Sequence, residues 1–187
     1  MTTNIQIGYR IWLVLIVIGI GFLPAGCGGR GKDEVGLGAG ARFVNAGSHD
    51  RMVRLPDSSM VVLVPGAGIL VSTGFDRDHR ELDLDGKAMF RIRGDSNAPF
   101  KVHTRNLQIE VLAAGSKFYV EAYRKDAGEE VILLEGKLRV TKSYHSQTDN
   151  EPELLTGGEM VMINRDIDLM EKEKMDGSEM KAWDAGK

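Results

Sequence analysis

The most evident chemical potential in the sequence lies in two pairs of aspartates. Asp83 and Asp85 stand two residues apart, so they share one face of a predicted strand, while Asp76 and Asp78 stand in a predicted loop. Two carboxylates on one face are the minimum set for a glycosidase, in which one acts as a general acid. The aromatic platform that sugar binding usually requires is not evident, and a solvated strand face explains these acids. No enzymatic activity is therefore expected.

The histidines and the single cysteine do not form a metal site. His49, His79, His103 and His145 are scattered, and no two of them stand at the spacing of a ligand pair on a strand or helix. Cys27 has no second cysteine to pair with, which excludes an internal disulfide. The net charge is -3 and aromatic residues make up 6%, a composition that does not favour nucleic-acid binding. We expect no metal and no cofactor.

The elements that carry these residues are strands, as two similar segments indicate. In Leu82–Ile92 apolar residues alternate with charged ones on both sides of Gly86, and Ile132–Val140 repeats the pattern around Gly136. A two-residue hairpin at Gly86 would place core residues opposite solvent residues, whereas a bend through Gly86 or a three-residue loop keeps the apolar face continuous. The same reasoning at Gly136 predicts Leu134 on one face with Leu138, and Ile132 with Val140.

The whole pattern predicts an all-β protein. About ten short strands at close spacing, separated by Pro and Gly turns, are typical of a sandwich, a jelly-roll or a short solenoid-like structure. We predict four regions. They are a signal or anchor segment at 1–27, a glycine-rich tether at 28–50, the β domain at 51–164 and a charged tail at 165–187. In the tail, one or two helical turns and a frayed end remain alternatives.

The N-terminal segment predicts attachment to a membrane. Residues 11–22 are almost wholly aliphatic, and no charge occurs between Arg10 and Arg30. In one interpretation this is a lipoprotein signal peptide, because Ala25 and Gly26 before Cys27 resemble a lipobox and Cys27 would carry the lipid. In the other it is an uncleaved anchor, since the uncharged run reaches the roughly 20 residues that span a bilayer. Both place the β domain outside the cytoplasm.

The strands also resemble a known family, the FecR domain, which is the periplasmic part of regulators of iron-uptake sigma factors. The family pattern V-x-L-P-D-G-S-x-V-x-L is matched by V-R-L-P-D-S-S-M-V-V-L, with Ser58 in place of the turn glycine. Lys87 replaces a family Glu and Gly157 a family Pro. Six segments match in the family's order: Val53–Leu63, Arg80–Ile92, Pro99–Thr104, Gly115–Val120, Val131–Val140 and Leu155–Glu159.

The resemblance implies a function in signalling across the cell envelope. A FecR-like module would bind an envelope protein, such as the signalling domain of a TonB-dependent receptor or another sigma regulator, and would face the periplasm from its membrane anchor. Family members carry a sigma-binding region before the membrane span, and only ten residues precede it here. We therefore expect no direct sigma binding. The alternative is a structural or glycan-binding envelope lipoprotein on the same fold. The residues that contact a partner stay unassigned.

Overall fold

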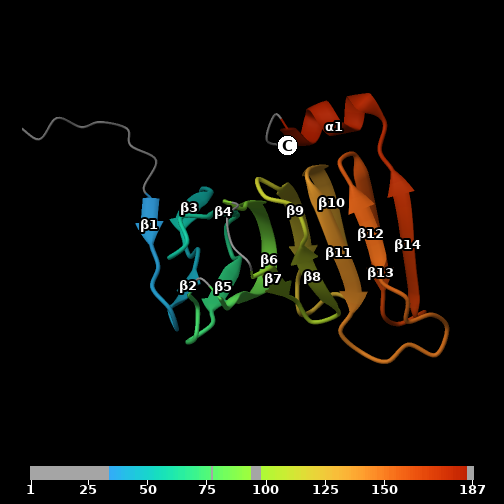
Figure 1. Ribbon diagram of the computed structural model, residues 1–187, viewed down its shortest axis with the longest axis horizontal. Coiled ribbons are helices and arrows are strands. Elements are labelled where there is room, and N and C mark those ends of the chain that lie inside the picture. The colour runs from blue at the N-terminus through green and yellow to red at the C-terminus, as the bar shows by residue number, and fades with distance from the viewer. Residues whose placement is uncertain (1–33, 77, 94–97, 185–187) are drawn as a thin grey trace, which may run out of the picture. The chain divides into compact units, whose positions relative to one another are not determined.

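The structure is a computed structural model that describes residues 34–76, 78–93 and 98–184 (Figure 1). These ranges contain fourteen strands and one short helix, which confirms the all-β prediction with more strands than the ten expected. The strands are β1 Glu34–Gly36, β2 Arg42–Val44, β3 Arg51–Arg54, β4 Met60–Leu63, β5 Gly68–Val71, β6 Arg80–Arg91, β7 Phe100–His103, β8 Leu107–Val111, β9 Lys117–Ala122, β10 Gly128–Glu135, β11 Lys137–Lys142, β12 Glu153–Thr156, β13 Glu159–Asn164 and β14 Leu169–Lys174, and the helix is α1 Gly177–Asp184.

The strands form two layers that share one long strand, β6. One layer, sheet A, has the order β1-β3-β4-β6-β9-β10-β13-β14, and the other, sheet B, has the order β2-β5-β6-β7-β8-β11-β12. All adjacent pairs are antiparallel except β1 with β3 and β6 with β7. Side chains from the inner faces of both layers fill one hydrophobic core. The all-β prediction is confirmed, and β6 joins the two layers into one nearly closed, barrel-like sheet.

β6 passes from one sheet to the other through a bend at Gly86. Its first half pairs with β5 and β7, and its second half pairs with β4 and β9. The inner face stays continuous through the bend, because Leu82, Leu84, Ala88 and Phe90 are all buried. Gly86 has φ +115°, and a Cβ there would lie 2.7 Å from the Cα of Ala67. The predicted bend is confirmed, and the glycine is required both by its dihedral angle and by lack of space.

The second crossing, at Gly136, differs from the prediction. Val131 and Leu133 face the main core, together with Leu138 and Val140 of β11. Leu134 and Ile132 were expected on that face, but they point outward into a second small cluster with Met175. A register irregularity between Leu133 and Glu135 changes the phase before Gly136. Alternation could not determine the phase here, since all residues from 131 to 134 are buried.

The folded body includes segments at both ends for which no strands were expected. β1 and β2 lie within the range predicted to be a tether, and they pair with β3 and β5. β14 lies within the predicted tail and pairs with β13 along its whole length. α1 follows it and lies across the strand ends in Figure 1, where Met180 packs against the second cluster. The local polarity of these segments concealed strands that are held by pairing with distant partners.

The predicted signal or anchor segment, including Cys27, lies outside the described residues. In the part of the chain that the structure describes, no helix has the length and apolar character needed to cross a membrane.

A buried ion pair connects the turn after β3 to the start of β6. The Arg80 side chain is 7% exposed, and its Nη1 lies 3.1 Å from Oδ2 of Asp57. Arg80 also donates to the backbone oxygens of Ala98 and Arg93. Asp57 accepts hydrogen bonds from the N–H and hydroxyl of Ser59. The network satisfies both buried charges, which is the condition for tolerating them inside the protein.

Candidate partner-binding face

The aspartate pair lies on the outer face of sheet B. Asp83 and Asp85 are both exposed on β6, in a hollow of about 430 Å³ that Arg42 and Arg124 also line. Asp85 accepts a hydrogen bond from the N–H of Arg124 and lies 3.6 Å from its Nε. A general acid needs an apolar, dry environment. This wet hollow beside two arginines does not provide one.

The four histidines do not meet. His49 and His145 are exposed in separate loops. His79 lies 3.6 Å from Asp76, and Nε2 of His103 lies 3.3 Å from Glu81. Among the described residues, no group of three potential ligands from His, Cys, Asp and Glu could hold a metal ion.

A cluster that the sequence did not reveal surrounds Lys142. Its Nζ donates to Oγ of Ser146 at 2.9 Å and lies 3.6 Å from Asp168. A serine beside a lysine is one arrangement of a nucleophile and its base. Here Ser146 is 2% exposed and its hydroxyl donates to Asp168. The cluster therefore holds the loop between β11 and β12 in place and presents no nucleophile to a substrate.

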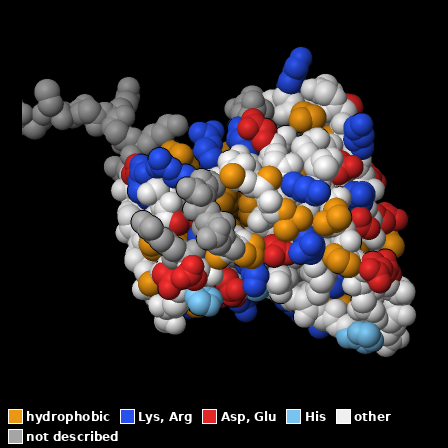
Figure 2. Space-filling view, viewed as in Figure 1, with side chains coloured by type: hydrophobic (Ala, Val, Ile, Leu, Met, Phe, Trp, Pro, Cys, Tyr) orange, Lys and Arg blue, Asp and Glu red, His pale blue; other side chains and the backbone are white. Residues whose placement is uncertain are grey.

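The outer faces of both sheets carry cross-strand ion pairs, which on sheet A join Lys87 to Glu121. On sheet B the side chains of neighbouring strands form ion pairs, such as Lys101 with Glu81 and Arg139 with Glu110. Such pairs keep a strand face solvated. The surface as a whole is not uniformly polar. On the face of the molecule seen in Figure 2, hydrophobic side chains gather across the middle and charged side chains surround them.

The outer face of sheet A carries a continuous apolar row. Direct strand pairing aligns Met52 with Val62, Val62 with Met89, and Met89 with Tyr119. The line continues through Ile132 and Met160. We call these six residues the apolar row. Ile132 is buried beneath the C-terminal segment, whereas the other five are partly exposed. The structure thus leaves Met52, Val62, Met89 and Tyr119 on the outer face in contact with water.

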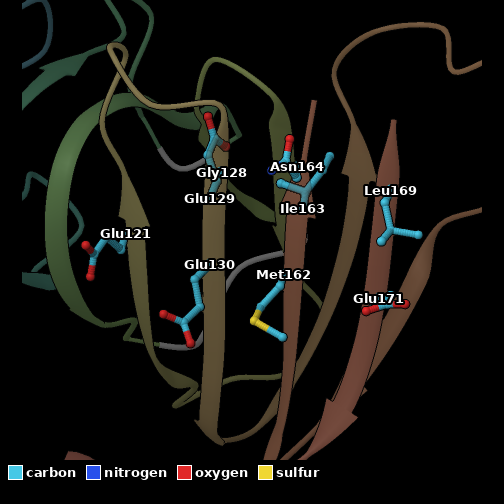
Figure 3. Close-up of a pocket in the computed structure, with 9 residues that line it drawn as sticks. All are labelled: Glu121, Gly128, Glu129, Glu130, Met162, Ile163, Asn164, Leu169 and Glu171. Atoms are coloured by element: carbon cyan, nitrogen blue, oxygen red, sulfur yellow. The ribbon is translucent and has the colours of Figure 1, made fainter. Parts of the chain in front are cut away.

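A groove of about 350 Å³ adjoins this row between β10, β13 and β14 (Figure 3). Its hydrocarbon part comes chiefly from Met162 and Leu169, and its carboxylates are Glu121, Glu130 and Glu171. We call these five residues the acidic groove. Burial raises the pKa of Glu130, and the negative charge of Glu121 raises it further, against the opposing effect of Lys87.

The acids of the groove were visible in the sequence only as scattered glutamates. Glu121 and Glu130 lie on different strands that pair directly, and Glu171 lies in the predicted tail. Alternation along a strand cannot show which wet faces adjoin, because that depends on the strand order.

The chain is similar to a known protein family and to two crystal structures. The model of a family described as FecR protein matches residues 42–139, just over half of the chain. Two crystal structures of a proposed anti-sigma factor from Parabacteroides distasonis, at 2.50 and 1.65 Å resolution, are similar, with a TM-score of 0.66 and 27% sequence identity. The similarity covers 78% of this chain and 65% of the length of that protein. No functionally curated protein matches the sequence.

Proposed function

The chain belongs to the FecR protein family, and from this premise we propose that it is a regulatory module of sigma-factor signalling that binds a protein partner through the apolar row. The family match and the similarity to a proposed anti-sigma factor both support a role in signalling. The proposed activity is binding and not catalysis.

The observation that supports the binding face is the unbroken line of apolar side chains across the outer face of sheet A. Both sheets bury one face in the same core. On the outer face of sheet A, strand pairing sets partly exposed Met52, Val62, Met89 and Tyr119 in one line, beside the ion pair of Lys87 and Glu121. On the outer face of sheet B, the exposed Leu70 and Leu154 stand directly opposite charged residues, Asp83 and Arg139. A contiguous apolar surface that is rimmed by charge marks an interaction site.

The proposed setting is the bacterial cell envelope. Residues 1–27 would tether the module to a membrane, either as an uncleaved anchor or through a lipid on Cys27, and the β domain would face the periplasm. Its proposed partner is the signalling domain of a TonB-dependent receptor or another sigma regulator. The hydrophobic N-terminal sequence and the family membership support this placement.

Site-specific crosslinking in the native source tests the proposal. A photo-crosslinking amino acid replaces Met89 on the outer face of sheet A in one full-length variant, and Gln108 on the outer face of sheet B in the matched control. We expect crosslinking from position 89 to a receptor signalling domain or a sigma regulator, and none of that product from position 108. In a separate variant, Met89→Glu should change sigma-dependent transcription in a reporter strain.

Either of two results would reject this function. Equal products from the two positions would mean that the apolar row is not the binding face. Crosslinks from position 89 to cell-wall fragments alone, together with unchanged transcription, would favour a structural or glycan-binding lipoprotein. Matched melting temperatures of the variants are the control for folding.

A further inference from the structure

We infer that the acidic groove binds a partner segment in which a lysine or arginine stands next to an apolar side chain. The inference rests on the proposed function, because it specifies the chemistry of the partner. The groove lies beside the apolar row on the same face of sheet A, since Met162 is two residues from Met160 on β13. One partner can therefore contact both.

The apolar part of the groove is uncovered. Met162 is 38% exposed and Leu169 is 43% exposed. They lie on the neighbouring strands β13 and β14, and Ile163 beneath them belongs to the core. A groove of about 350 Å³ is at the small end of the range for binding sites. It has room for a few side chains of a partner and not for a domain.

The charge of the groove selects a cationic partner. Glu121 on β9 stands directly opposite Glu130 on β10. On the other side of Glu130, Met162 on β13 lies between Glu130 and Glu171 on β14. Like charges directly opposite on neighbouring strands destabilise a sheet. Lys87 forms an ion pair with Glu121 at 2.9 Å. Within the described residues, the side-chain carboxylates of Glu130 and Glu171 form no ion pair or hydrogen bond, so a second cation would relieve a repulsion that the folded chain retains.

Lys87 offsets part of the charge on Glu130, but Lys172, the basic residue next to Glu171, does not add to this effect. Lys172 on β14 lies between Glu171 and Glu173 in sequence, so its side chain points to the opposite side of the strand. There it donates to the carbonyl oxygen of Leu154 and lies 3.5 Å from Glu153. Glu129 also lines the groove, but its carboxylate is turned inward and accepts from Thr104 and the N–H of Asn106.

The carboxylates are arranged for an extended cationic segment and not for a metal ion. Adjacent strands are separated by about 4.8 Å, so Glu130 and Glu171, two strands apart, are about 10 Å from each other at their backbones. The thioether side chain of Met162 lies between them. No set of three carboxylates in the described residues converges on a metal position. The ammonium or guanidinium of the partner would meet Glu130 beside Glu121, and its apolar neighbour would lie on Met162 and Leu169.

The test uses the full-length chain in nanodiscs of zwitterionic lipid, with carbon-13 on the methionine methyl groups. The methyl signal of Met162 reports on the groove, and it is assigned by its loss in the Met162→Leu variant. The signals of the other eight of the nine methionines serve as internal references. Three synthetic hexapeptides are titrated: alternating lysine and leucine, alternating glutamate and leucine, and alternating lysine and serine. Empty nanodiscs give the background of peptide binding to lipid.

We expect the lysine–leucine peptide to shift the Met162 signal, and the other two peptides to bind at least tenfold more weakly. The double variant Glu130→Gln/Glu171→Gln should raise the Kd of the lysine–leucine peptide at least tenfold. Glu173→Gln, on the same strand but outside the groove, should change it less than twofold.

Three results would overturn the inference. The first is equal binding of the lysine–leucine and glutamate–leucine peptides, and the second is an unchanged Kd in the double variant. The third is a Met162 signal that does not move while another methionine signal does. Crosslinking from Met89 to a sigma regulator would remain unaffected by any of these. Failure here would therefore reject the partner chemistry and leave the proposed function standing.

Discussion

At the scale of single residues, the turn after β3 holds Ser58 in a conformation that favours glycine. Its φ is +66°, in the left-handed region that costs a residue with a Cβ roughly 1 to 2 kcal/mol. The family pattern has glycine at this position. Ser58→Gly should raise the free energy of unfolding by about 0.5 to 1 kcal/mol, because the relieved strain exceeds the extra chain entropy of glycine.

Urea unfolding of Ser58→Gly and Ser58→Ala measures this effect. Ser58→Ala keeps the Cβ and should leave the midpoint close to that of the parent chain. A glycine variant that is no more stable than the alanine variant would show that the turn is not strained.

We expect the carboxylate of Asp168 to make the stability of the fold fall at acid pH. Burial raises its pKa, but hydrogen bonds from the N–H of Gln147 and the hydroxyls of Ser146 and Tyr144, with the charge of Lys142, outweigh burial and lower the pKa to about 2. The unfolded chain would bind this proton near pH 3.9. A carboxylate whose pKa is lower in the folded protein than in the unfolded chain stabilises the fold at every pH above its unfolded-state pKa. That contribution is lost as the pH falls from about 4 towards 2.

Melting temperatures between pH 5 and pH 2 test the assignment. The parent chain should lose stability steeply below pH 4, whereas Asp168→Asn should start less stable at pH 5 and lose less below pH 4. Parallel curves for the two proteins would assign the acid sensitivity to other carboxylates.

At the scale of elements, the bend in β6 is the most sensitive point of the fold. A methyl group on Gly86 would lie 2.7 Å from both the Cα and the Cβ of Ala67, and φ is +115°. Gly86→Ala should therefore destabilise the protein by more than about 2 kcal/mol, since backbone strain and overpacking add together. Gly36→Ala is the matched control, because no atom lies within 4 Å of its added Cβ.

Thermal unfolding of the two glycine variants provides the measurement. Gly36→Ala should change stability by at most about 1 kcal/mol, in the stabilising direction. A Gly86→Ala protein as stable as the Gly36→Ala protein would mean that β6 bends without needing this residue.

The elements also show where the sequence was sufficient. The alternation in β6 predicted its buried face and its bend, because polar and apolar residues were cleanly separated on the two sides. In β10 the same reasoning placed Leu134 on the wrong face, since a second hydrophobic cluster under Met175 buries the outer side as well. β1 and β14 escaped prediction because pairing with β3 and β13, and not apolar content, holds them in the sheet.

The candidate site was predictable only in part, for a related reason. The wet face of β6, which carries Met89, followed from the sequence, but the strands that adjoin it depend on long-range pairing. Met89 and Tyr119 are thirty residues apart in the chain and directly opposed in the sheet. No local pattern encodes that contact.

At the scale of the whole molecule, the shared strand makes the two sheets one cooperative unit. β6 supplies hydrogen bonds and core residues to both layers, so loss of one sheet removes the support of the other. We expect a single unfolding transition for the β domain. Far-ultraviolet circular dichroism, which reports on strands, and fluorescence of Tyr119 and the other tyrosines should give the same midpoint in urea.

Two separated midpoints would show instead that each sheet is stable without the other. Hydrogen exchange would then identify the more stable sheet by its slower amide exchange. The expected result is one protection level for the central strands of both layers, β7 and β9 included.

The two end strands of sheet A have a consequence for the crowding of neighbouring copies. β14 alternates acid and base through Glu171, Lys172, Glu173 and Lys174, and nearly all of it is exposed. At the other edge β1 has only three residues. Charged or very short edge strands do not template the addition of a further strand. Neighbouring copies, however crowded, would thus not polymerise edge to edge, and the outer face of the sheet stays available for the proposed partner.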